Sequence, residues 1–104
     1  MPTAPGTLTR NSPNRITALF VIDDLQYTFS ATVSPSIQPF TSQTATLDYE
    51  SLDKLTSTRL YSGRIGTTTF KLALDNGPTM KGELNLPGVV PASTVNGNGA
   101  WEQN

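Results

Sequence analysis

The sequence predicts an all-β domain, either an antiparallel β-sandwich or a small β-barrel of six to seven strands. Apolar and polar residues alternate with a period of two through most of the middle of the chain. Turn-forming residues separate these runs at short intervals, and no segment of helix length shows the helical period. Many short strands joined by turns are typical of sandwiches and barrels.

The beginning of the chain lacks this alternation. Residues 1–14 contain three prolines, one glycine and small polar residues, which predicts a flexible, proline-rich N-terminal arm. The single all-β domain is therefore expected to span residues 15–104. One core is enough at this length, and it can bury roughly two-thirds of the surface that the unfolded chain exposes.

Two runs after the arm predict a hairpin. Residues 16–22 place four apolar side chains on one face and Leu19 and Val21 on the other, so this strand is expected to be central or to lie at an interface. Residues 25–33 alternate without an error over nine residues. The two aspartates at 23–24 suit an exposed tight turn between these runs.

The next segment is expected to be a loop that crosses the domain. Residues 34–40 include two prolines, which cannot donate to a strand ladder, and Ile37 and Phe40 are candidates to pin the loop to the core. Alternation then resumes at residues 45–50 and, more weakly, at residues 56–65. Both segments are predicted to be strands.

The second half of the chain predicts another hairpin. Residues 51–55 suit one helical turn in a connector. Residues 68–86 alternate on both sides of an Asp-Asn-Gly-Pro turn at 75–78, in which Asn and Gly both accept positive φ. Gly82 predicts a bulge or a close backbone approach. Residues 100–103 are expected to return as an edge strand.

The chain has no histidine and no cysteine. Histidine is the usual general acid or base near neutral pH, and the two residues supply most zinc, copper and nucleophile chemistry. Serine and threonine are plentiful, but no Ser-Lys motif offers one of them a base. We therefore expect a protein that is not an enzyme and that has no cofactor.

The charge pattern bears on partners and location. Charged residues make up 14% of the chain, the net charge is -1, and the seven Lys and Arg are scattered along the sequence, so nucleic acid is not an expected partner. No apolar run approaches the roughly 20 residues of a membrane span, and residues 1–6 do not resemble a signal peptide. The location stays open between cytoplasmic and extracellular.

The sequence also suggests a ligand-binding surface. A saccharide site commonly combines an aromatic face with planar amides or carboxylates. Trp101, the only tryptophan, follows the amide-rich and glycine-rich residues 96–99, although a core tryptophan after a tight turn has the same pattern. Tyr61 falls on the polar phase of its strand and is expected to be exposed. The candidate ligand-binding residues are Asn96, Asn98, Trp101, Asp75, Asn76 and Tyr61.

Three carboxylates form a second candidate site. Asp48 and Glu50 are expected to share one strand face, and Asp53 follows soon after. Carboxylate oxygens are the ligands that calcium prefers, so these residues are a calcium candidate. A solvated strand face explains the same pattern without a metal.

These observations rank three functions. The leading hypothesis is a non-enzymatic, lectin-like or adhesin-like binding module that recognises a glycan or a protein ligand through loop amides and an aromatic residue. The first alternative is a structural or assembly protein, such as a surface, fibre or virion subunit, that forms a homo-oligomer through residues 1–14 and 16–22. The second is a small barrel around an apolar ligand, although Phe20, Phe29 and Phe70 are expected to fill its interior.

Overall fold

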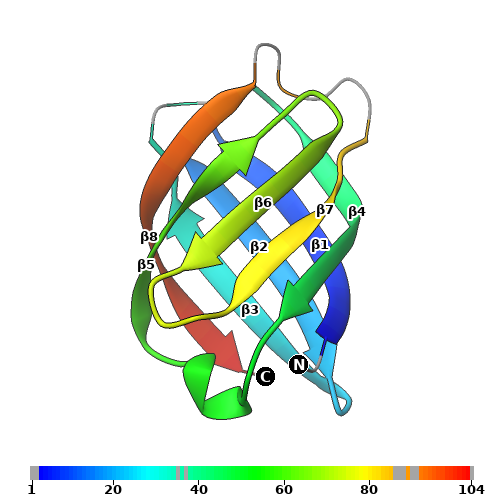
Figure 1. Cartoon of the computed structure of the whole chain (residues 1–104), viewed down its shortest axis with the longest axis vertical. Coiled ribbons are helices and arrows are strands. Elements are labelled where there is room, and N and C mark those ends of the chain that lie inside the picture. The colour runs from blue at the N-terminus through cyan, green and yellow to red at the C-terminus, as the bar shows by residue number, and fades with distance from the viewer. Residues whose placement is uncertain (1–2, 35, 37, 86–88, 90–91, 104) are drawn as a thin grey trace.

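Eight strands close into an antiparallel barrel in the computed structural model, which describes residues 3–34, 36, 38–85, 89 and 92–103 (Figure 1). The elements are β1 (Thr3–Ser12), β2 (Arg15–Ile22), β3 (Leu25–Thr32), β4 (Thr41–Asp48), the short 3-10 helix η1 (Leu52–Lys54), β5 (Thr58–Ile65), β6 (Thr69–Leu74), β7 (Thr79–Glu83) and β8 (Ser93–Gln103). Their order around the barrel is β1-β2-β3-β8-β5-β6-β7-β4, and β4 pairs with β1 to close it. The fold is therefore the barrel of the two predicted alternatives, with eight strands rather than six to seven.

The additional strand is β1. It pairs with β2 on one side and with β4 on the other, and the side chains of Ala4 and Leu8 are buried. The prediction of a flexible arm over residues 1–14 is thus wrong for residues 3–12. Irregularities in both ladders, at Arg10/Ser12 toward β2 and between Gly6 and Leu8 toward β4, break the period of two that identifies a strand in a sequence.

Both predicted hairpins are present. β2 and β3 pair in one unbroken register, and the two turn residues Asp23 and Asp24 have φ of 52° and 66°. Positive φ at both central residues is the requirement of a type I′ turn, which two aspartates meet here without a glycine. β6 pairs with β7 across a turn in which Gly77 has φ of 120°.

The crossing loop before β4 and the helical turn η1 connect the remaining strands. Phe40 is buried at the end of the crossing loop and its carbonyl accepts a hydrogen bond from the Arg10 amide, whereas Ile37 lies outside the described residues. η1 forms the predicted helical turn between β4 and β5. β8 lies between β3 and β5, so the expectation of an edge strand at residues 100–103 is wrong, because a closed barrel has no edges.

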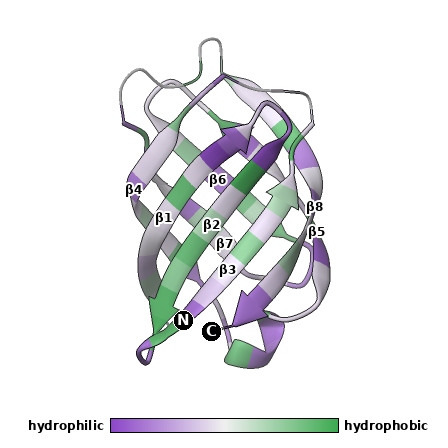
Figure 2. Ribbon diagram, turned by 180° about the vertical axis from the view of Figure 1, so that it is seen from behind, coloured by the Kyte–Doolittle hydropathy of each residue, from purple (hydrophilic) through white to green (hydrophobic). Residues whose placement is uncertain are grey.

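Side chains fill the barrel. Inward residues alternate with outward residues along the strands, and Figure 2 shows the apolar character of β2 within this pattern. The Phe29 ring contacts the rings of Tyr61 and Trp101. Gly82 makes the predicted close approach, since a Cβ there would lie 2.9 Å from Cα of Ala45. In the part of the chain that the structure describes, no helix has the length and apolarity to cross a membrane.

Candidate functional site

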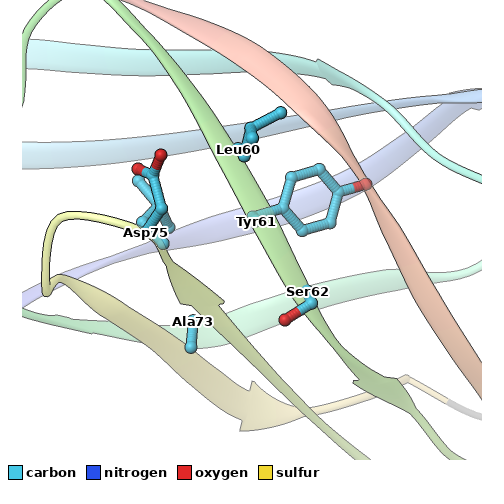
Figure 3. A pocket seen from close by; sticks show the side chains of 6 residues that line it. Leu60, Tyr61, Ser62, Ala73 and Asp75 are labelled. Carbon is cyan, nitrogen blue, oxygen red and sulfur yellow. The ribbon is translucent and has the colours of Figure 1, made fainter.

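Two shallow hollows flank β5 on the outer wall of the barrel. The hollow between β5 and β6 has a volume of about 300 Å³, and the hollow between β5 and β8 has a volume of about 370 Å³. Leu60 borders both hollows, and 60% of its surface is exposed. Figure 3 shows Leu60 among the residues that line the hollow between β5 and β6. The exposed residues that line them are Leu60, Ser62, Ala73, Asp75, Asn96 and Asn98. We call this set the β8–β5–β6 face.

Strand register brings these residues together from distant parts of the chain. Leu60 lies opposite Asn98 of β8, and the Asp75 amide donates a hydrogen bond of 2.9 Å to the Leu60 carbonyl from the β6 side. Ser62 lies opposite Asn96. Neighbouring strands are about 4.8 Å apart, so the two predicted amides and the carboxylate of Asp75 lie around one exposed leucine.

The two amide side chains differ in how they are held. The Thr32 hydroxyl donates to Oδ1 of Asn98 at 3.0 Å, which orients that amide and leaves its Nδ2 group to a ligand. The backbone of Asn96 exchanges two hydrogen bonds with Ser34, while its side chain is exposed. The face therefore offers amide donors and acceptors on a rigid strand.

The segment that holds both amides is a strand and not the expected loop. A Cβ at Gly97 would lie 2.2 Å from the Thr32 carbonyl oxygen, and a Cβ at Gly99 would lie 2.6 Å from Cβ of Ala31. These glycines thus allow β8 to pack closely against β3. Because they occupy the inward positions, Asn96 and Asn98 point outward.

Trp101 lies inside the barrel, and this position does not support a role in the ligand site on the outer wall. Only 7% of its surface is exposed, and its ring centroid lies 4.9 Å from that of Phe29. Its Nε1 atom is buried without a hydrogen-bond partner among the described residues. Once residues 96–101 form a strand, alternation alone separates the even-numbered amides from the odd-numbered tryptophan.

Tyr61 is also buried, with 4% of its surface exposed, so the prediction of an exposed contact is wrong. It shares the inward phase of β5 with Ile65, and Leu60 takes the outward phase instead. The ring extends from β5 toward the neighbouring strand β8 (Figure 3). Its hydroxyl donates a hydrogen bond of 2.5 Å to the carbonyl of Thr32, the last residue of β3. Burial raises the pKa of Tyr61 to about 12.

The Tyr61→Phe variant is expected to change how stability depends on pH. Because the pKa of Tyr61 is raised in the folded state, its stabilising contribution is complete below pH 10 and is lost as the pH rises toward about 12. Urea titrations at pH 9 and pH 11 should show a smaller loss of unfolding free energy for Tyr61→Phe than for the wild type. Equal losses in both proteins would contradict the assignment of this titration to Tyr61.

Asn76 holds the turn beside the hollows in place and does not line either hollow. Its Nδ2 atom donates a hydrogen bond of 2.9 Å to the Lys54 carbonyl and thereby ties the β6–β7 turn to η1. Its Oδ1 atom is buried without a hydrogen-bond partner in the described part of the chain. Of the predicted pair, the structure therefore brings Asp75 to the β8–β5–β6 face and leaves Asn76 out of it.

The three carboxylates of the calcium candidate do not converge. β4 ends at Asp48, whose carboxylate lies 3.2 Å from Nζ of Lys81, so Asp48 and Glu50 do not share a strand. The Ser51 hydroxyl donates to the Asp53 carboxylate, and this bond is the main reason that the pKa of Asp53 is lowered. Among the described residues, no three acidic side chains form a group that could hold a metal ion.

Comparison with known proteins adds no family, because no protein-family model, curated protein or solved structure matches this chain. Sequence reasoning missed Leu60, Ser62 and Ala73 as members of the face. The alternation along β5 carried a signal for Leu60 and Ser62. The odd-numbered positions hold two large apolar or aromatic residues, Tyr61 and Ile65, whereas the even-numbered positions hold only Leu60, so the odd-numbered side is the better candidate for the core. The fold and its surface define a small eight-stranded barrel with amides and a carboxylate on its outer wall.

Proposed function

We propose that the protein is a non-enzymatic carbohydrate-binding module that holds a saccharide on the β8–β5–β6 face. The observation that supports this proposal most is the placement of Asn96 and Asn98 on one side of Leu60 and of Asp75 on the other, over two adjacent hollows. Amides and carboxylates pair with sugar hydroxyls, and the exposed Leu60 side chain packs against the C–H groups of a sugar ring. Leu60 thus takes the apolar role that the sequence suggested for Trp101.

The same surface favours binding over catalysis. Glycoside hydrolysis commonly uses two carboxyl groups about 5–9.5 Å apart, one on each side of the scissile bond. Among the residues of the face, Asp75 alone carries a carboxylate. The groups on this surface can orient hydroxyls. The two amides lie on a paired strand that loses little freedom when a ligand binds, and Asp75 lies in the turn directly after β6.

Asn96→Ala is expected to weaken saccharide binding about 2- to 13-fold. The loss of one amide hydrogen bond removes about 0.5–1.5 kcal/mol of binding free energy. The side chain is exposed, so the melting temperature should stay within about 2 °C of the wild type. Affinity chromatography on a panel of immobilised neutral and acidic oligosaccharides, followed by calorimetry with the ligand retained best, measures the change.

Gln43→Ala is the matched control. Gln43 is an exposed amide on β4, which β7 separates from the β8–β5–β6 face, and its loss should leave retention unchanged. The proposal fails if the wild type binds no saccharide on the panel. It also fails if Asn96→Ala and Gln43→Ala bind as tightly as the wild type.

The two alternative functions have less support. Residues 3–12 belong to the barrel, so they are not a free arm through which copies of the chain could associate. The apolar surface left on β2 and β3 consists mainly of Val21 and Leu25, which are 47% and 38% exposed. A stable interface buries about 800 Å² on each partner, more than two such side chains provide. An apolar ligand inside the barrel would compete with core side chains such as Phe20 and Phe29 for the same space.

A further inference from the structure

Three cations lie in one row on the outer wall of the barrel. Arg64 of β5 pairs in register with Lys71 of β6, and Lys71 pairs with Lys81 of β7. All three side chains are exposed. The charges look scattered in the sequence, but the strand register gathers three of the seven Lys and Arg into this cationic row.

The cationic row is unfavourable for the protein on its own. Like charges directly opposite each other on neighbouring strands have Cβ atoms about 4.5–5.5 Å apart and destabilise a sheet. Asp48 neutralises Lys81 at 3.2 Å, while Arg64 and Lys71 have no ion pair among the described residues. An anion bound over Arg64 and Lys71 would offset this repulsion.

The cationic row adjoins the β8–β5–β6 face. Arg64 lies two residues after Ser62 on the outward side of β5, and Lys71 lies two residues before Ala73 on β6. Ser62 and Ala73 pair in register and have short side chains, so they form a low floor beside the cationic row. Leu60 borders this floor on the other side, about 13 Å from Arg64 along the strand, which leaves room for a sugar ring.

We infer that the saccharide is acidic and that its carboxylate or sulfate group lies on Arg64 and Lys71. This inference rests on the proposed function and adds the class of ligand. The ring would lie over Ser62 and Ala73, with hydroxyls toward the amides and its anionic group directed away from Asp75. The surface suits a nucleic acid less well, because all eight aromatic side chains are buried and none can stack on a base.

Calorimetry with matched pairs of ligands tests this inference. Tetragalacturonate is compared with its methyl ester, and a dextran sulfate oligosaccharide with unsulfated dextran, so that each pair differs in charge and the two pairs distinguish carboxylate from sulfate. At 50 mM salt, at least one acidic member should bind about tenfold more tightly than its neutral partner. Because the attraction is between charges, the preference should shrink at 300 mM salt.

Lys71→Gln should reduce the preference for the acidic ligand to about twofold or less. The same variant should raise the melting temperature by about 1–4 °C, because it removes the repulsion with Arg64 and Lys81. Lys54→Gln is the control, since Lys54 lies on η1 away from the cationic row and the same unit of charge is removed. It should leave both the preference and the melting temperature unchanged.

Three results would overturn the inference: equal binding of the charged and neutral members of both pairs, equal losses in Lys71→Gln and Lys54→Gln, or equally tight binding of tetrathymidylate and the acidic saccharides. A wild type that retains neutral saccharides without an acidic preference overturns only this inference. A wild type that binds no saccharide of either kind overturns the proposed function as well.

Discussion

Trp101→Ala is expected to lower the free energy of unfolding by about 3–5 kcal/mol. Only 7% of the surface of Trp101 is exposed. Its ring lies against the Phe29 ring, and the residue belongs to β8, the last strand in the sequence. Its removal leaves a large cavity among side chains that are held by paired strands. The melting temperature should fall on the order of 15 °C, as measured by far-ultraviolet circular dichroism.

Trp101→Phe is the matched variant. It keeps an aromatic ring on Phe29 and removes a buried Nε1 atom that has no hydrogen-bond partner in the described part of the chain, so it should cost about 1–2 kcal/mol. The opposite result is informative. If Trp101→Ala melts like the wild type and loses saccharide binding, then Trp101 contacts the ligand at the surface and is not a core residue.

Gly97→Ala is expected to cost about 2–3 kcal/mol in unfolding free energy. The added Cβ would lie 2.2 Å from the Thr32 carbonyl oxygen, which belongs to a paired strand and cannot move alone. β8 would have to withdraw from β3. The Tyr61 hydroxyl donates to the same Thr32 carbonyl, so this movement also disturbs a buried hydrogen bond.

Urea denaturation of Gly97→Ala and Gly66→Ala provides the comparison. At Gly66 the nearest heavy atom to an added Cβ is the Thr69 carbonyl oxygen at 3.1 Å, so that variant should lose about 1 kcal/mol or less. The midpoint of unfolding should therefore fall much further for Gly97→Ala. If its unfolding free energy stays within about 0.5 kcal/mol of the wild type, residues 96–99 form a yielding loop.

The elements that sequence reasoning found share strong local signals. Residues 25–32 form β3 because their alternation is unbroken, and the 75–78 turn joins β6 to β7 because Gly77 accepts positive φ. The strand that it missed, β1, has irregular pairing on both sides and contains Pro5, which hides the period of two. Its partners, β2 and β4, determine that it is a strand.

The candidate site was predicted only in part, for a similar reason. Asn96, Asn98 and Asp75 were found by residue type, and the structure brings them to one face. Tyr61 was placed on the wrong side of the wall, and Trp101, for which the sequence allowed either a ligand contact or a core position, lies in the core. The sequence shows that residues alternate, but the packing of larger side chains into one core decides which phase points inward.

By itself, the sequence of this protein determined an all-β domain with two hairpins, because turn chemistry and alternation act over a few neighbouring residues. Only the tertiary structure decided that the sheet closes into a barrel, that residues 3–12 complete it, and that residues 64, 71 and 81 lie side by side. Closure and register depend on pairing between distant segments. Such pairing follows from the packing of all eight strands around one core.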